Sequence, residues 1–386
     1  MLLNEGTIIS LVSLTNGVSG GETYFPDIHR SFKITLLIAE KGELSDEFSA
    51  SFKIDPRYVP KPNQLLEFLA NSDNFMEIKV SALKRFSPDS LSMMEFRNKK
   101  DYYVAGKIYE DWPLMGEEIR ETWSLKLGAE FHMTNARSLF NQNGIGLPLY
   151  EGKMIHQFDS YFAEPRFWIE EKKGRSNLLR RERDKNQVLG YQQYRLAYRD
   201  IARSTDQRTI IATILPQNSF AGNTLILETN TQDSVMLFIL ALMNSFILDH
   251  IVRYKVGTHV SMFYAYQLPM PRLTAGNPYF DAIVPRAAQL TCTTAAFAPL
   301  WEEVMGTPWI DPQVPGTLEV PGTSMPTTDP SQRQQLRNEL DAIIARLYGL
   351  NRQEFAHILD TFPLVFPNTP EGQTKKEALL ALFDHI

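Results

Sequence analysis

The sequence predicts an α+β fold, in which a mixed-sheet region is followed by a helical C-terminal region. Short runs rich in β-branched and aromatic residues, such as Thr7–Leu14 and Thr209–Leu215, are typical of strands. The apolar run Val235–Val252 and the amphipathic run Ser331–Tyr348 have the length and spacing of helices. Because strands and helices do not alternate regularly along the chain, the pattern favours α+β over a parallel α/β sheet.

The totals set broad limits on the class of protein. With 386 residues, the chain is long enough for two or three domains with ample cores. Cys292 is the only cysteine, so no disulfide forms within the chain, and we expect a cytoplasmic protein. No signal peptide is evident. The most apolar run, Val235–Leu248, is too short for a bilayer and contains Asn244 and Ser245, which indicates a buried helix.

The N-terminal part is predicted to form a hairpin and then a mixed segment. Two strand-like runs, Thr7–Leu14 and Phe32–Ala39, flank a loop rich in Gly, Asn and Ser, which favours a hairpin. Downstream we expect a short helix over Asn63–Asn71, a strand over Met76–Ala82, and a helix from about Asn98 to Tyr109 that stops before Pro113.

The middle of the chain is predicted to carry most of the strands. After a Gly- and Asn-rich turn at Asn141–Leu147, the expected elements are strands at Leu149–Tyr150, Phe158–Phe162, Thr209–Leu215 and Leu225–Asn230, a single helix over Val235–Val252 and an extended piece over Val260–Pro269. These strands form the mixed sheet of the predicted fold.

After Pro271 the pattern becomes helical. Runs over Tyr279–Gln289, Ala295–Met305 and Ser331–Tyr348 are predicted helices, and Gly349 is a C-terminal stop for the last of them. Asn351 with Glu354 has the spacing of a capping box for a further helix. The segment Gly306–Pro330 is rich in Pro and Gly and is predicted to be a linker or irregular strap.

Charge is distributed unevenly along the chain. Between Arg166 and Arg208 twelve Lys or Arg face six Asp or Glu, a local charge of +6 (12 − 6). The whole chain has a net charge of −6, so the remainder carries −12 (−6 − 6). A basic segment inside an acidic chain is typical of a surface that binds an anionic partner.

Several blocks of the sequence, in order, resemble a known enzyme group. LYEGKMIHQFD (Leu149–Asp159), the strings within Tyr194–Pro216, and the block Leu240–Pro271 resemble the target-recognition domain of single-chain type II restriction-modification enzymes and of related phage-defence N6-adenine DNA methyltransferases. The string at Leu336–Pro363 resembles their helical C-terminus, and the first strands resemble the end of their methyltransferase domain.

The resemblance implies a division of the chain and a set of partners. It implies terminal strands of a methyltransferase-like domain at 1–42, a connecting segment at 43–140, a target-recognition core at 141–272, and a helical region at 273–386 with the strap at 306–330. It also implies bacterial origin, double-stranded DNA as ligand and no membrane. The chain would start inside a catalytic domain whose preceding part is cut off or encoded as a separate subunit.

The motifs of a methyltransferase are not found in the sequence. Such an enzyme needs a glycine-rich loop for S-adenosylmethionine and an Asn/Asp-Pro-Pro-Tyr/Phe motif for the flipped base. Asn277-Pro278-Tyr279 lacks one proline and is predicted to be a turn, as is Asn143-Gly144-Ile145-Gly146. We therefore expect no cofactor in this chain, no methylation by it alone, and S-adenosylmethionine in a missing or partner catalytic portion.

Two alternatives remain open at this point. Asp159 followed by Glu170-Glu171-Lys172 fits the loose template of a metal-dependent nuclease, but such a spacing arises often by chance in a charged chain, and the residues favour a solvated loop. The seven histidines show no metal-ligand spacing, so no metal site is predicted. A protein-interaction scaffold in a defence complex is the second alternative.

Candidate DNA contacts follow from side-chain chemistry. Phosphates are held by Lys and Arg, whereas base edges are read by Arg, Asn and Gln. The predicted phosphate contacts are Arg175, Arg180, Arg181, Arg183 and Lys185, and the predicted base contacts are Lys153, His156, Gln157, Gln187, Gln192, Gln193, Lys255 and His259. Arg199 and Arg208 are expected in ion pairs inside the fold. Tyr150, Phe158, Phe162, Phe167 and Trp168 are expected in the core.

Overall fold

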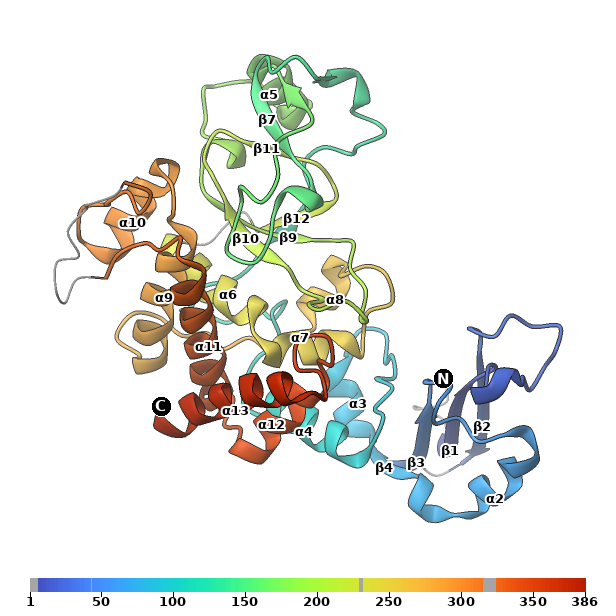
Figure 1. Ribbon diagram of the computed structural model, residues 1–386. Coiled ribbons are helices and arrows are strands. Elements are labelled where there is room, and N and C mark those ends of the chain that lie inside the picture. Colours follow the sequence, from blue (N-terminus) through green and yellow to red (C-terminus); the bar gives the residue numbers. More distant parts are fainter. Residues whose placement is uncertain (1–5, 43, 229–231, 315–323) are drawn as a thin grey trace. The chain divides into compact units, whose positions relative to one another are not determined.

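The computed structural model describes residues 6–42, 44–228, 232–314 and 324–386, and it confirms the α+β class (Figure 1). The chain divides into two compact units, Met1–Asp111 and Trp112–Ile386. Each unit has its own sheet and helices and is described separately below. The domain boundaries predicted at residues 42, 140 and 272 stay predictions.

The first unit is built on a four-stranded sheet with the order β2-β1-β3-β4. β1 (Gly6–Thr15) pairs antiparallel with β2 (Lys33–Lys41), which confirms the predicted hairpin, and parallel with β3 (Glu47–Lys53). β4 (Met76–Lys79) closes the other edge, antiparallel to β3. The strand predicted over 76–82 is therefore shorter, because α3 begins at Val80.

Three helices complete this unit. They are α2 (Leu65–Ala70), α3 (Val80–Phe86) and α4 (Lys99–Glu110), and the predicted helices at 63–71 and 98–109 are confirmed. Asn98 caps α4 by accepting a hydrogen bond from the Asp101 backbone N–H, which satisfies one otherwise unpaired donor of the first turn. The small core contains Val12, Leu14, Val18 and Val59.

Strand β2 is an edge strand with apolar side chains exposed on both faces. Leu36, Leu37 and Ile38 are consecutive, so they point alternately to the two faces, and they are 39%, 44% and 58% exposed. Antiparallel edge strands with one solvated face normally alternate apolar and polar residues. An apolar edge of this kind is a template for pairing with another chain.

The second unit contains two small sheets, of which the first is antiparallel and the second is mixed. One has the order β10-β9-β12-β5 and the other β11-β7-β8-β6. The strands are β5 (Leu127–Gly128), β6 (Phe140–Asn141), β7 (Leu147–Tyr150), β8 (Trp168–Ile169), β9 (Arg195–Arg199), β10 (Ala212–Leu215), β11 (Phe220–Ala221) and β12 (Leu225–Glu228). The strand predicted at 158–162 is wrong, because Phe158 has φ 59 and the chain turns tightly there.

The helices that pack on these sheets differ in two respects from the prediction. α6 (Asp233–Asn244) and α7 (Phe246–Arg253) replace the single helix predicted over 235–252, and they meet at a bend of 58°. Ser245 has extended backbone angles there, and its hydroxyl accepts from the Leu248 N–H, so it ends one helix and caps the next. The piece predicted as extended at 260–269 contains the short helix α8 (Met262–Tyr266).

The C-terminal region is helical, as predicted. It consists of α9 (Pro278–Thr291), α10 (Ala298–Met305), α11 (Pro330–Leu347), α12 (Arg352–Asp360) and α13 (Pro370–His385), in orange to red in Figure 1. The capping box at Asn351 is confirmed by reciprocal bonds with Glu354 of 2.9 and 2.7 Å. Asn277 caps α9, and residues 315–323 of the predicted strap lie outside the described residues.

Within the described ranges, no single helix has both the length and the hydropathy of a membrane span. The pair α6 and α7 reaches that threshold only when both are taken together across their bend, and nearly all of their residues are buried in the second unit.

Candidate nucleic-acid interface

Among the residues predicted to contact DNA, those that follow helix α5 form the largest group of exposed positive charges. α5 (Glu171–Leu179) lies against the sheet, with Gly174 facing the Phe220 ring so closely that a Cβ there would lie 2.4 Å from it. The helix ends at Arg180, which has a positive φ of 54. Residues 180–185, named the basic loop below, then carry Arg180, Arg181, Arg183 and Lys185.

The basic loop is held by Arg175, one turn before the end of α5. The Arg175 guanidinium donates two hydrogen bonds of 2.7 Å to the two carboxylate oxygens of Asp184, and further bonds to the Gln187 carbonyl at 2.8 Å and the Gln192 side chain at 3.2 Å. The Arg175 guanidinium holds the pKa of Asp184 down, at about 2. A bidentate pair of this kind fixes the loop at both ends.

This brace gives a structural role to three of the predicted contacts, Arg175, Gln187 and Gln192. Arg175 was predicted to hold a phosphate and Gln192 to read a base, but both side chains are engaged in the brace. Gln192 also accepts from the Leu189 N–H at 2.9 Å. Gln187, another predicted base contact, accepts from the Lys185 N–H at 2.7 Å. These three side chains shape the loop through their hydrogen bonds.

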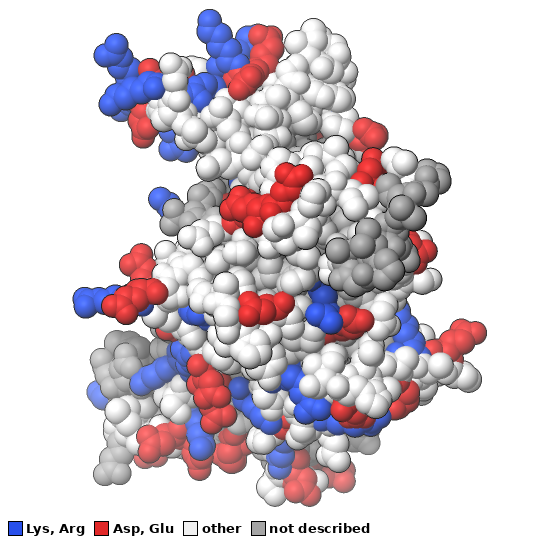
Figure 2. Space-filling model, turned by 90° about the vertical axis from the view of Figure 1, so that its left-hand side faces the viewer, with Lys and Arg blue, Asp and Glu red and all other residues white. Residues whose placement is uncertain are grey.

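The four cations of the basic loop are exposed. No ion pair to Arg180, Arg181, Arg183 or Lys185 is found within the part of the chain that the structure describes. Figure 2 shows Lys and Arg side chains projecting from the α5 end of the second unit, at the top of the view, with acidic side chains between them. The predicted phosphate contacts are thus reduced to these four side chains, which stay predictions.

Other arginines of the same basic segment are tied into the fold. Arg195 is buried on β9, where it donates to Glu130 and to the Ser219 carbonyl. Arg208 lies 3.3 Å from Asp249, which confirms its predicted ion pair. Arg199 is also internal, but its guanidinium donates to the Ile155 carbonyl and forms no described ion pair, so that part of the prediction is wrong.

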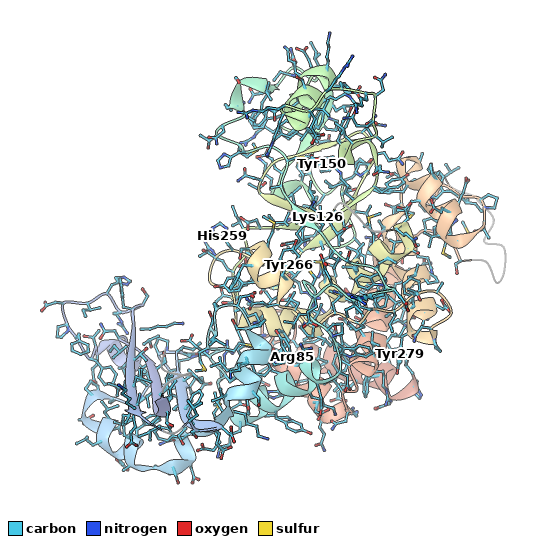
Figure 3. The ribbon with its side chains drawn as sticks, turned by 180° about the vertical axis from the view of Figure 1, so that it is seen from behind. Arg85, Lys126, Tyr150, His259, Tyr266 and Tyr279 are labelled. Carbon is cyan, nitrogen blue, oxygen red and sulfur yellow. The ribbon has the colours of Figure 1, made fainter. Side chains whose placement is uncertain are left out.

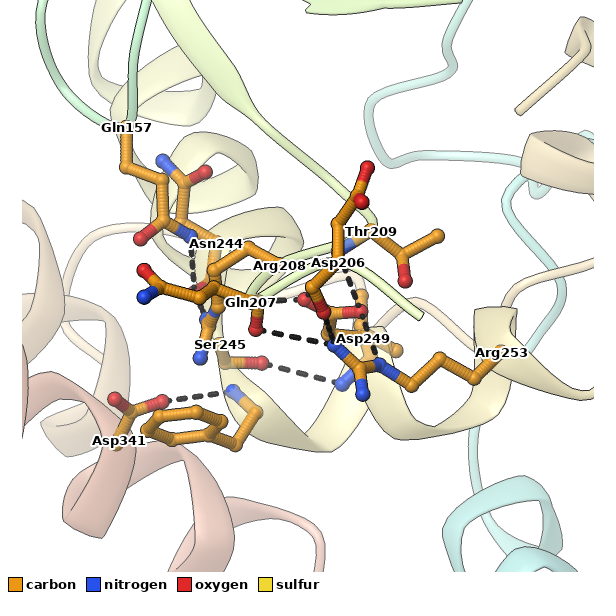
Figure 4. A network of polar contacts seen from close by, with 12 residues as sticks. Gln157, Asp206, Gln207, Arg208, Thr209, Asn244, Ser245, Asp249, Arg253 and Asp341 are labelled. Atoms are coloured by element: carbon orange, nitrogen blue, oxygen red, sulfur yellow. Dashed lines mark hydrogen bonds and ion pairs between the residues drawn. The ribbon is translucent and has the colours of Figure 1, made fainter. Parts of the chain in front are cut away.

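Arg208 belongs to a buried network, the Asp249 cluster, which comprises Arg208, Thr209, Asp249 and Arg253 (Figure 4). Asp249 is fully buried and accepts from the Thr209 N–H at 3.1 and 3.0 Å while pairing with both arginines at 3.3 Å. Arg253 also donates to the Asp206 and Gln207 carbonyls. A buried carboxylate satisfied in this way connects α7 to the segment that precedes β10.

The GKMIHQ block divides between surface and interior. Lys153 is exposed and lies 3.8 Å from Glu151. Gln157 is buried and donates to the Asn244 carbonyl at 3.1 Å, so its predicted base contact is corrected: its amide holds the end of α6. His156 is partly buried, and desolvation first, then the nearby Arg199, lower its pKa.

The predicted contacts in the 255–259 loop also differ from one another. Lys255 is packed in the interior near Gln267, to which it donates at 3.1 Å, and burial lowers its pKa to about 7. Its predicted base contact is therefore corrected. His259, which is labelled in Figure 3, is exposed. Its Nδ1 lies 2.9 Å from the Asp200 carboxylate. Gln193, two residues before β9, is also exposed. His259, Gln193, Lys153 and His156 stay candidates.

One predicted core aromatic is wrong. Tyr150, Phe158 and Phe167 are buried as expected, and Trp168 is half-buried. Phe162, however, is 56% exposed and lies over the His156 ring, with centroids 4.9 Å apart and planes at 33°. An exposed ring after a tight turn is a platform on which a base can stack. The exposure of Phe162 was not predicted, because the aromatic residues of Phe158–Phe162 indicated a strand.

The residues of the nuclease template form no obvious metal site. Among the residues that the structure describes, no three His, Cys, Asp or Glu side chains gather in a way that could hold a metal ion. Glu170 pairs with Lys173 at 2.6 Å, and Asp159 accepts from the Tyr161 N–H at 2.8 Å. Both carboxylates thus have local structural partners.

Comparisons with known proteins show low similarity. No family model matches the sequence, and no curated protein matches it. Among solved structures, the chain is similar to the type IIL restriction-modification enzyme MmeI in complex with DNA, with a TM-score of 0.40, 10% identity, and coverage of 93% of this chain and 46% of that one.

Two further solved structures show weaker similarity. The type IIG restriction endonuclease BpuSI has a TM-score of 0.27 at 12% identity, covering 90% of this chain and 45% of its own. The HsdS subunit from Thermoanaerobacter tengcongensis has a TM-score of 0.26 at 14% identity, covering 64% and 50%. The chain therefore spans about half the length of these three proteins.

Proposed function

We propose that this chain binds double-stranded DNA through the basic loop and acts as the sequence-recognition module of a bacterial restriction-modification or phage-defence adenine methyltransferase. The observation that carries the proposal is the contrast inside one basic segment: Arg175 and Asp184 hold the loop in place, while Arg180, Arg181 and Arg183 project without described carboxylate partners. The resemblance of the sequence blocks to target-recognition domains supports the same proposal.

The loop suits a phosphate backbone for a physical reason. Guanidinium groups donate in a planar fork that matches phosphate oxygens, and each contact releases condensed counterions from the duplex. Side chains held on a braced loop lose less freedom on binding than side chains on a mobile one. The exposed candidates Lys153, Gln193 and His259 would read base edges once the loop has positioned the backbone.

The proposal includes a catalytic partner that carries S-adenosylmethionine. Its support is strand β2 of the first unit, whose apolar residues are exposed on both faces at a sheet edge. Such an edge fits a sheet that continues in another domain or subunit. With that partner absent, the chain is proposed to bind DNA in the bacterial cytoplasm without modifying it.

A salt titration of DNA affinity tests the proposal. Fluorescence anisotropy with a mixed-sequence duplex should give a log-log slope of about −3 to −4 if the four cations of the basic loop each contact about one phosphate. The triple variant R180Q/R181Q/R183Q should lower the magnitude of that slope by about 3. Activity on the duplex should be absent, so a plasmid incubated with Mg²⁺ or Mn²⁺ should remain intact.

A matched variant controls for the loss of charge alone. K84Q/K99Q/K100Q removes three exposed positive charges from the helices of the first unit and should leave the slope unchanged. Equal effects of the two triple variants would mean that net charge, and not the basic loop, drives binding. Absence of binding to any duplex at low salt would contradict the proposal, and cleaved plasmid would favour the nuclease alternative.

A further inference from the structure

A polar cavity of about 420 Å³ lies where the sheets of the second unit meet its C-terminal helices. His156 and Gln157 line it from the turn before β8, Arg199 from β9, and Asn244 and Phe246 from the junction of α6 and α7. The opposite wall comes from α11 and α13. Its size is in the range of small-molecule sites, larger than a lone ion requires.

The cavity lining carries surplus positive charge. Its cations are Arg199, Arg208, Arg337 and Lys375, and its carboxylates are Asp206 and Asp341, which leaves +2 (4 − 2) without counting His156. Adding the neighbouring Arg253 and Asp249 contributes one charge of each sign and leaves this surplus unchanged. Positive charge confined in a partly buried space favours an anion.

Backbone carbonyls hold Arg199 and Arg208 in place, and among the described residues Arg208 alone of the two has a carboxylate partner, Asp249, which it shares with Arg253. Arg199 donates to the Ile155 carbonyl, and Arg208 donates to the Asn244 carbonyl while its guanidinium lies over the Phe246 ring at 3.9 Å. The Nε atoms of both residues are buried and have no hydrogen-bond acceptor among the described residues. Arg208 Nε is within 3.3 Å of Asp249, an ion pair without hydrogen-bond geometry.

The other two cations lie on the helical wall. Arg337 donates to the Gln334 side chain at 3.0 Å on its own helix, and Asp341 lies one turn further along α11. Asp341 uses one oxygen to accept from the Phe246 N–H at 2.8 Å. Lys375 is exposed, lies 5.6 Å from the centroid of the Phe366 ring, and forms no ion pair within the described part of the chain.

We propose that this cavity binds a phosphate group, with Arg199 and Arg208 as fixed donors and Arg337 and Lys375 closing on it from α11 and α13. A phosphate group has more acceptor oxygens than a carboxylate. It can therefore accept hydrogen bonds from several converging guanidinium groups at once. The phosphate belongs either to the DNA backbone or to a free phosphorylated small molecule. The first source rests on the proposed function, whereas the second does not.

The direct test is binding of inorganic phosphate to the full chain, measured by calorimetry and by ³¹P line broadening. Wild-type protein should bind, and R337Q/K375Q should bind at least about tenfold more weakly, because two charged donors to the phosphate are lost. K375E serves as a second variant, since an exposed lysine tolerates replacement without unfolding. K99Q/K100Q, with the same charge loss elsewhere, should bind phosphate as wild type does.

The DNA titration then distinguishes the two sources. If the backbone supplies the phosphate, R337Q/K375Q should also lower the magnitude of the salt slope by about 2. If phosphate binding falls while the DNA slope is unchanged, the site takes a free phosphorylated ligand. Wild-type protein that binds phosphate but no duplex would refute the proposed function and keep this site. Absence of phosphate binding, with an unchanged DNA slope in R337Q/K375Q, overturns the inference.

Discussion

The basic loop and the Asp249 cluster both contain arginines of the basic segment at residues 166–208, joined in the cluster by Arg253 of α7, and the two regions use these arginines in opposite ways. In the loop, Arg180, Arg181 and Arg183 are exposed, and the carboxylate of Asp184 is occupied by Arg175. In the cluster, Arg208 and Arg253 share one fully buried carboxylate. A count of positive charges therefore does not locate a binding surface, because the position of the carboxylates decides which charges remain available.

The largest expected effect is on stability, in the cluster. Asp249→Ala should lower the free energy of unfolding by about 3–5 kcal/mol, because it leaves Arg208 and Arg253 buried without a counter-charge and the Thr209 N–H without an acceptor. Urea denaturation measures the change. Arg183→Gln in the loop should stay within about 0.5 kcal/mol of wild type, and equal losses for the two variants would abolish the distinction between the regions.

A second effect depends on pH and concerns Asp341, beside the cluster. Burial raises its pKa to about 6 from an ordinary 3.8, so the folded state holds a proton that the unfolded state releases. This contribution is complete below about pH 4 and is lost as pH rises through about 6, amounting to at most about 3 kcal/mol. Asp341→Asn keeps the acceptor for Phe246 and should flatten the pH dependence of the unfolding free energy over that window. An unchanged pH profile would contradict the assignment.

A smaller effect separates geometry from charge in the basic loop. Asp184→Ala removes a negative charge, so charge alone predicts tighter DNA binding. Loss of the brace leaves four long side chains to be ordered on binding, at about 0.5–1.5 kcal/mol for each one immobilised. We expect DNA affinity to fall by about threefold to tenfold in anisotropy titrations. Affinity that rises would show that the brace has no part in binding.

The smallest expected effect is on DNA affinity, at Lys255. Because this side chain is packed in the interior beside Gln267, Lys255→Met should leave the affinity and its salt slope unchanged. Burial lowers the pKa of the ammonium to about 7, so the same substitution should raise stability most below that pH, where the folded protein must bury the charge. A clear loss of DNA affinity would return Lys255 to the interface.

Much of the local structure followed from the sequence because it depends on neighbouring residues. The capping box at Asn351 and the hairpin of β1 and β2 were predictable from spacing within a few residues. The break at Ser245 was not, because Asn244 and Ser245 are the only polar residues of the run Val235–Leu248, and two polar residues do not by themselves end a helix. The exposure of the Phe162 ring was not predictable either, because the aromatic residues around it are typical of a strand.

In the candidate site, too, some features were predictable from the sequence and others depend on the tertiary structure. Residue types and charge predicted a basic segment with the exposed cations at 180, 181, 183 and 185, and the resemblance to target-recognition domains gave DNA as its expected ligand. The roles of Arg175, Gln157 and Lys255 were decided by partners far along the chain, such as Asn244, which lies 87 residues from Gln157. The contribution of Arg337 and Lys375 to a cavity had no sequence signal at all.

By itself, the sequence determined the α+β class, the helical C-terminus and the concentration of positive charge in one segment, because these properties depend on composition and on short-range periodicity. Only the tertiary structure decided which of those charges are neutralised, which amides are buried, and where a cavity forms. The physical reason is that ion pairs and burial depend on distance in space, and helices distant in sequence supply the groups that complete them.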